Sequence, residues 1–107
     1  MGITIEEKKA LRKLKEMVSR KYKLLEFILY GSKVTGNDTE ESDIDLMIEL
    51  EEETIDVRWD IYKMVAQVNI DFGCVISPIL FSRGELEKGP MKESPIYRRV
   101  QEKGISI

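Results

Sequence analysis

Residues 27–50 read FILYGSKVTGNDTEESDIDLMIEL, and this stretch decides the fold. The apolar run that ends at Tyr30 predicts a buried strand, and Gly31-Ser32 breaks that strand. Ten residues later, Asp43 and Asp45 open a second run, in which apolar side chains occupy every other position. Such alternation is typical of a half-buried strand. The stretch therefore predicts two strands, with a polar turn after the first and two carboxylates at the start of the second.

The residue types at these positions favour phosphate and metal chemistry. Asp43 and Asp45 would point to one side of the strand, about 6–7 Å apart along the backbone. Oxygen ligands of this kind suit Mg²⁺, which binds one or two carboxylates together with substrate phosphates. Gly31 permits a close backbone approach, Ser32 offers an N–H group and a hydroxyl, and Lys33 adds positive charge for a triphosphate. Taken singly, each has a plainer interpretation: a capped turn, a solvated strand edge and a solvated lysine.

A third carboxylate is expected from the next strand. A helix is predicted over residues 54–68 and a strand over residues 69–77, with Asp71 on the polar face of that strand. The helical crossover would place this strand near the strand of Asp43, and three carboxylates would hold one or two Mg²⁺ ions. Asp71 could also take a proton from an attacking hydroxyl. The alternative is that Asp71 is an ordinary surface carboxylate.

The remaining segments add helices and one short strand. Thr4 and Glu7 form a capping-box pattern at the start of a helix that ends near residues 20–22. A turn-rich segment follows over residues 33–42, with a single helical turn after Ser32. Residues 78–90 are mixed, with a short helix after Ser82; a helix over 95–103 and an edge strand over 105–107 complete the chain. The fold class predicted from these elements is α+β.

The helix over residues 54–68 has two apolar stripes on roughly opposite sides. One stripe contains Ile55, Trp59, Tyr62 and Ala66, and the other contains Val57, Ile61, Met64, Val65 and Val68. Because a surface helix needs only one apolar stripe, the second predicts a cover other than the core. That cover is either another chain, in a homo- or hetero-oligomer, or the rest of a monomer that buries the helix broadly.

The bulk composition limits the function further. A chain of 107 residues is expected to form one domain, residues 1–107, with no separate substrate domain. Its net charge of −3 argues against nonspecific attraction to nucleic acid or to an anionic membrane. The chain has no histidine, so catalysis by a Ser-His-Asp triad is excluded. Because it shows no signal-peptide pattern and no membrane-length apolar run, a cytoplasmic location is expected.

The spacing of Gly31-Ser32 and Asp43-Ile44-Asp45 resembles the signature of the DNA polymerase beta-like nucleotidyltransferases, and the short chain resembles their minimal (MNT) domain. The resemblance covers roughly residues 24–107. It implies a small mixed β-sheet, sandwich-like, with helices packed on one face. It also implies transfer of AMP, or another nucleoside monophosphate, from ATP with Mg²⁺. By this match Asp43, Asp45 and, more loosely, Asp71 would be catalytic metal ligands, while Gly31 and Ser32 would hold the triphosphate.

The resemblance also implies a partner. Minimal members often act as the antitoxin of an HEPN-domain toxin, in some cases by adenylylating a tyrosine of that toxin. The leading hypothesis is thus a protein adenylyltransferase, and the alternative is a noncatalytic antitoxin or binding module that docks through the helix over 54–68. A small-molecule adenylyltransferase is disfavoured because the helical substrate domain is missing. The chain departs from the family where Arg-Ala-Arg-Gly is common after Gly-Ser, since it has Lys33-Val34-Thr35-Gly36.

Overall fold

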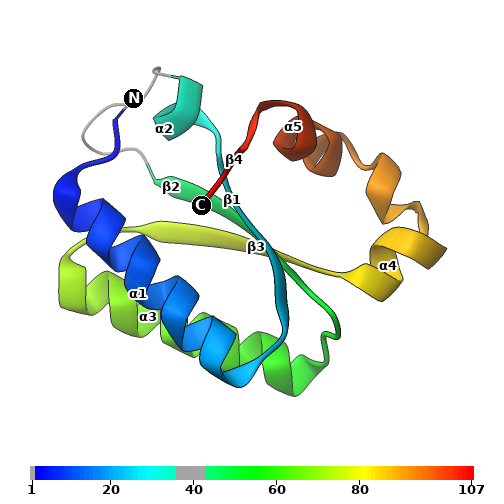
Figure 1. The fold of residues 1–107 in the computed structure, drawn as a ribbon, viewed down its shortest axis with the longest axis horizontal. Helices are drawn as coiled ribbons and strands as arrows, with labels where there is room; N and C mark the ends of the chain where they lie inside the picture. The colour runs from blue at the N-terminus through cyan, green and yellow to red at the C-terminus, as the bar shows by residue number, and fades with distance from the viewer. Residues whose placement is uncertain (1, 36–42) are drawn as a thin grey trace.

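The chain alternates helices and strands around one sheet (Figure 1). The computed structural model describes residues 2–35 and 43–107. In chain order the elements are α1 (Ile5–Lys21), β1 (Leu24–Tyr30), α2 (Ser32–Thr35), β2 (Ile44–Leu50), α3 (Ile55–Phe72), β3 (Ile76–Ser82), α4 (Arg83–Lys88), η1 (Pro90–Glu93), α5 (Pro95–Lys103) and β4 (Ile105–Ser106). Within these described ranges, no helix is both long enough and apolar enough to cross a membrane.

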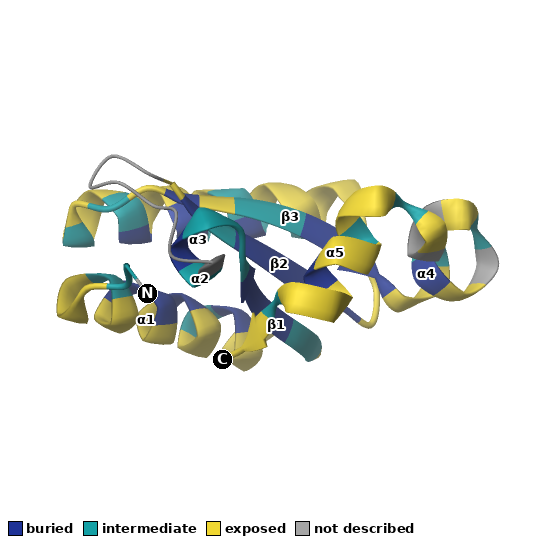
Figure 2. Cartoon of the chain, turned by 90° about the horizontal axis from the view of Figure 1, so that it is seen from above, coloured by how far each residue is buried: buried dark blue, intermediate teal, exposed yellow. Residues whose placement is uncertain are grey.

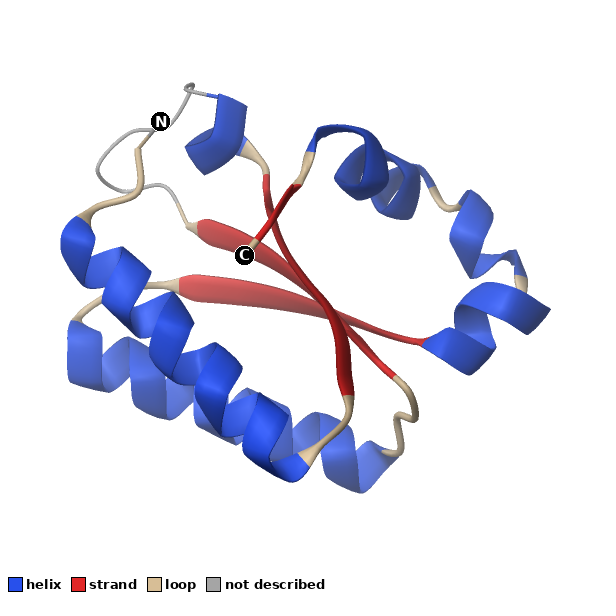
Figure 3. Ribbon diagram, viewed as in Figure 1, coloured by secondary structure: helices blue, strands red, loops and turns tan. Residues whose placement is uncertain are grey.

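The four strands form one mixed sheet in the order β3-β2-β1-β4. β1 is antiparallel to β2 and β4, whereas β2 and β3 run parallel, joined by the α3 crossover. The strands cross with a pronounced twist (Figure 3). The predicted α+β class with a small mixed sheet is confirmed.

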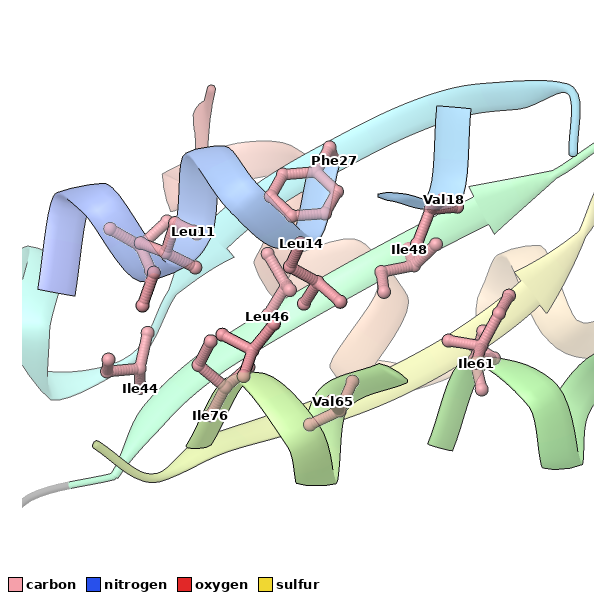
Figure 4. Packing of buried hydrophobic residues seen from close by; sticks show 14 of the residues in the cluster. Leu11, Leu14, Val18, Phe27, Ile44, Leu46, Ile48, Ile61, Val65 and Ile76 are labelled. Carbon is pink, nitrogen blue, oxygen red and sulfur yellow. The ribbon is translucent and has the colours of Figure 1, made fainter. Parts of the chain in front are cut away.

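The main core lies between one face of the sheet and the helices α1 and α3. Alternate residues of β2 enter this core, and Leu46 and Ile48 are completely buried. They meet Leu14 of α1 and Ile61 of α3 (Figure 4). Because α1 and α3 bury only one stripe each, their outward turns remain exposed (Figure 2). The alternation predicted for residues 43–50 is therefore what anchors β2.

The opposite face of the sheet is covered in part by α4 and α5. Met47 of β2 is completely buried there, beside Phe81 and Val100. The rings of Phe81 and Tyr97 meet edge to face, with centroids 5.4 Å apart. The expected helices on one face are α1 and α3, and this second cluster is an addition to that arrangement. Burial on this face decreases along β2 from Met47 to the half-buried Asp45 and the exposed Asp43.

The prediction of a strand over residues 69–77 is wrong except for Ile76 and Ser77, which begin β3. Residues 69–72 continue α3, whose buried stripe runs on from Val65 and Val68 to Phe72. The alternation of Ile70, Phe72, Cys74 and Ile76 imitates a strand, but helical spacing prevails. Gly73 ends the helix in the left-handed conformation, at φ 64°, and its N–H bonds to the Asn69 carbonyl.

The third strand instead begins at Ile76, in a segment that the sequence pattern left partly as mixed structure. The Asn69 side chain holds its first residue: Oδ1 accepts from the Ile76 N–H at 2.8 Å, and Nδ2 donates to the Ile76 carbonyl at 3.2 Å. Pro78 is tolerated within β3 because β3 is an edge strand of the sheet.

The other predicted elements agree closely with the structure. Both capping boxes form, Thr4 with Glu7 and Ser82 with Glu85. The helix over 95–103 and the short edge strand are present, as is a helical turn from Ser32. Of the turn-rich segment, residues 36–42 lie outside the described residues.

Glu49 is a buried carboxylate on the face of the sheet covered by α4 and α5, and it predicts a pH-dependent stability. Burial raises the pKa of Glu49 and outweighs the opposing attraction of Arg83, whose guanidinium lies 3.7 Å away. A raised pKa in the folded state favours the protein at acid pH and opposes folding once Glu49 ionises. We expect Glu49→Gln to raise the thermal midpoint at pH 7, and this gain should shrink toward zero as the pH falls below the ordinary range of glutamate. The exposed Glu102→Gln is the control; an equal gain in both variants would contradict the assignment.

Candidate active site

Asp43 and Asp45 stand at the open end of β2. The strand is held at this point by the backbone bond from the Ile44 N–H to the Val75 carbonyl, at 2.8 Å. Ile44 is completely buried in the main core, so its neighbours Asp43 and Asp45 lie on the opposite face of the strand. Asp43 is exposed and Asp45 is half-buried. The predicted placement of the two carboxylates on one face is confirmed.

Gly31 lies directly against the carboxylate of Asp45. The antiparallel register pairs Tyr30 with Asp45, so the turn after β1 arrives beside the start of β2. Gly31 has φ 82°, a conformation that side chains disfavour, and a Cβ at this position would overlap Asp45 Oδ2 and stand 3.0 Å from its Cγ. Both the positive φ and the close approach of Asp45 therefore require a glycine at position 31. The Gly31-Ser32 turn and the carboxylate pair, which are separated in the sequence, therefore lie side by side in the structure.

The electrostatics of this corner favour a bound cation. Burial raises the pKa of Asp45, and the negative charge of Asp43 raises it further. The phenol of Tyr30 also has a raised pKa, chiefly from burial and then from Asp45. A hard cation that prefers oxygen ligands would stabilise the charged form of Asp45, which burial and the neighbouring Asp43 disfavour. The donor set fits one Mg²⁺ that takes its remaining ligands from substrate phosphates and water.

Ser32 begins the short helix α2 immediately after Gly31. The Val34 N–H donates to the Gly31 carbonyl at 3.0 Å, which closes the turn. Ser32 is half-buried. The contact of Gly31 and Ser32 with a triphosphate stays a prediction.

Lys33 lies elsewhere than predicted. Its side chain is only 3% exposed, and its ammonium lies 3.4 Å from Glu7 Oε2 and 3.3 Å from the Gly2 carbonyl oxygen, near the start of α1. A buried cation is stable only when it is paired, and Glu7 provides that pairing. The expectation of a solvated lysine is therefore wrong, and a contact of Lys33 with a triphosphate stays a prediction.

Asp71 is also displaced from the site. It lies in the last turn of α3, exposed, where its Oδ1 accepts a hydrogen bond from Gln67 Nε2 at 2.8 Å. Across residues 2–35 and 43–107, no three histidine, cysteine, aspartate or glutamate side chains gather as a metal site. The prediction that Asp71 is the third carboxylate of the site therefore needs correction. The alternative, that Asp71 is an ordinary surface carboxylate, agrees with the structure.

Ser77 is the residue of β3 that lies beside Asp45. The parallel register pairs the two directly, so their side chains share a face of the sheet. Sequence reasoning missed Ser77 because it began the strand seven residues too early. The signal that could have located it is Gly73, a helix terminator that moves the strand toward Ile76.

Comparison with known proteins shows the family of this chain. Residues 11–105 match the family described as the nucleotidyltransferase domain. A protein of Methanocaldococcus jannaschii named "Putative protein adenylyltransferase MJ1379" is 49% identical over 47 residues, which are 44% of this chain and 47% of that protein. The chain thus matches about half the length of this curated relative. A crystal structure from Sulfolobus solfataricus, described as "a putative nucleotidyltransferase", has 22% identity and a TM-score of 0.48, and the match covers 99% of this chain and 89% of that one.

The chain is a small α+β domain that carries a pair of carboxylates at one end of β2. The chain belongs to the nucleotidyltransferase domain family, since the family match extends over most of its residues.

Two glycines with positive φ provide a matched test of the corner at Asp45. Gly73→Ala introduces backbone strain alone, because a Cβ there meets nothing within 4 Å, whereas Gly31→Ala adds a clash with the Asp45 carboxylate. We expect each to lose about 1–2 kcal/mol of unfolding free energy from strain, and Gly31→Ala to lose more. Only Gly31→Ala should weaken Mg²⁺-dependent ATP binding, by about tenfold or more as measured by calorimetric titration. Equal nucleotide affinity in the two variants would show that the glycine does not shape this corner.

Proposed function

We propose that this protein transfers AMP from ATP to a hydroxyl group of a partner protein, with Mg²⁺, and that the partner is an HEPN-domain toxin for which it serves as antitoxin. One observation carries the proposal: Gly31 packs against the Asp45 carboxylate, so the turn that would bind phosphate lies beside the two carboxylates that would bind metal. Membership in the nucleotidyltransferase family supports the reaction class. The name of the archaeal relative, a putative protein adenylyltransferase, supports the proposal that the acceptor is a protein.

In this proposal, one set of residues binds the metal and another set binds the phosphates. Asp43 and Asp45 would hold Mg²⁺, which supplies neutralisation of the phosphate charge. The backbone of Gly31 and Ser32 would hold the triphosphate, because a glycine lets phosphate oxygens approach main-chain N–H groups closely. Half-burial of Asp45 reduces solvent screening of these charges.

The reaction itself is an in-line displacement at phosphorus. The acceptor oxygen forms a bond to the α-phosphorus, and the bond from that phosphorus to the bridging oxygen breaks. Pyrophosphate leaves with the electron pair, and the hydroxyl proton passes to water at the exposed edge beside Asp43. With Asp71 outside the site, the chain's contribution is mainly positioning and charge stabilisation.

A noncatalytic antitoxin is the second candidate, and a specific observation favours it. In the described part of the chain no group of three potential metal ligands forms, and Lys33 is buried in an ion pair with Glu7. Such a protein would neutralise its partner by docking alone. Nucleotide dependence separates the two candidates: a docking antitoxin retains neutralisation after the carboxylates are removed.

Asp45→Asn tests the enzymatic proposal, with Asp71→Asn as its matched control. The purified chain is mixed with Mg²⁺, ATP labelled at the α-phosphate, and the protein encoded by the neighbouring open reading frame. We expect Asp45→Asn to lower protein labelling at least ~100-fold through loss of a metal ligand. Asp71→Asn should label within about twofold of the parent, since Asp71 is exposed near the end of α3, where its carboxylate accepts a hydrogen bond from Gln67.

The outcomes of that experiment are distinct. Equal loss of labelling in the two variants would restore Asp71 to the site. Absence of labelling in the parent protein, together with toxin neutralisation that survives Asp45→Asn, would replace the enzyme with the docking antitoxin.

Ser77→Asp tests the metal site by addition. The register places this new carboxylate beside Asp45, on the face that also carries Asp43. We expect the affinity for Mg²⁺ to rise about tenfold, because a third oxygen ligand adds charge to the site. The matched control is Ser106→Asp on β4, at the far edge of the sheet, which should leave the affinity unchanged. A gain in the control, or none in Ser77→Asp, would place the ion elsewhere.

A further inference from the structure

One face of α3 exposes large apolar side chains along its whole length. Ile55, Trp59 and Ile70 are 75%, 64% and 76% exposed, and Ala66 between them is exposed as well. We call these four residues the α3 stripe. The opposite side of the helix is buried against the sheet and α1, so nothing in the described chain covers the stripe. Figure 2 shows the outward turns of this helix as exposed. The expectation that the monomer buries this helix broadly is wrong.

The four residues form a narrow ridge. At 100° per residue, their positions fall within about 60° of the helix circumference. The stripe spans four turns, and exposed apolar residues clustered in this way mark an interaction site, unlike scattered ones.

The order of the residues along the ridge is symmetric. Ile55 and Ile70 lie equally far from the midpoint between Tyr62 and Lys63, and so do Trp59 and Ala66. Against an antiparallel copy of the same helix, Ile55 would face Ile70 of the copy, and the large Trp59 would face the small Ala66. A two-fold interface must be self-complementary in this sense, whereas the surface for an unrelated partner has no need of such symmetry.

Two charges of opposite sign lie on one flank of the ridge. Lys63 lies next to the midpoint and Asp60 lies on the same flank. In the antiparallel arrangement Lys63 of one chain comes within two residue rises, about 3 Å along the axis, of Asp60 of the other. Asp60 is already fixed in place by Lys21, at 2.6 Å, and by the Tyr22 hydroxyl, at 2.5 Å. In the antiparallel arrangement the two opposite charges on this flank would therefore lie at a similar height along the helix axis.

We propose that the α3 stripe is the interface of a two-fold homodimer, in which two α3 helices pack antiparallel with Trp59 of each chain seated on Ala66 of the other. The occupant is a second copy of this chain. The proposal is independent of the activity, because it rests on a surface away from Gly31 and Asp45.

An exchange of the two paired residues tests the proposal. We expect the parent protein to sediment at twice the chain mass of 12.4 kDa. Trp59→Ala removes the anchor and Ala66→Trp sets two tryptophans against each other, so each should raise the dissociation constant at least ~30-fold. The double variant Trp59→Ala with Ala66→Trp restores a large residue opposite a small one, and it should dimerise within about threefold of the parent. Ser19→Lys, exposed on α1, is the control and should leave the dimer intact.

Trp59 also supplies a second readout, because it is the only tryptophan. Its emission should shift to longer wavelength on dilution through the dissociation constant. In a Cys74→Ser background, Ile55→Cys combined with Ile70→Cys should form an interchain disulfide, whereas either cysteine alone should not, since like positions lie about 22 Å apart along the axis.

Three results would overturn the proposal. They are a single-chain mass at every concentration, a double variant that remains dissociated, or disulfides from the single cysteines. If the stripe binds a partner of different sequence while the chain alone stays monomeric, the partner replaces the second copy as occupant. Circular dichroism of each variant confirms that loss of the dimer is not loss of the fold.

Discussion

The site depends on one contact, the backbone of Gly31 against the carboxylate of Asp45. Any side chain at position 31 would occupy the space of Asp45 Oδ2, and the backbone there adopts φ 82°. The contact follows from the antiparallel pairing of β1 and β2, which places Tyr30 opposite Asp45. Because both strands are anchored by buried residues, the core holds the Gly31-Ser32 turn beside the carboxylate pair.

The two faces of the sheet differ in how completely helices cover them. One face is sealed by α1 and α3 and supplies the main core, with Leu46 and Ile48 completely buried. The other is sealed by α4 and α5 only as far as Met47, which leaves Asp45 half-buried and Asp43 exposed at the open end of β2. This gradient of burial suits a site that must bind a charged substrate from solvent and still limit screening at the reacting atoms.

The features that could be predicted from the sequence are local. The Gly31-Ser32 turn, the alternation of β2 and the capping boxes at Thr4 and Ser82 depend on neighbours within a few positions. The predictions that failed depend on features that extend over longer stretches of the chain. Asp71 was misplaced because alternation and helical spacing coincide over residues 69–72, and only the length of α3 decides between them. The burial of Lys33 could not be predicted because Glu7, with which it pairs, lies on another helix, and no local pattern reveals that pairing.

A crystal structure with Mn²⁺ and a non-hydrolysable ATP analogue tests the central claim most directly. Mn²⁺ takes the oxygen ligands of Mg²⁺ and can be located by its anomalous scattering. The account predicts an ion bound by both Asp43 and Asp45, with the triphosphate against the backbone of Gly31 and Ser32. An ion held elsewhere, or a nucleotide bound away from this turn, would contradict it.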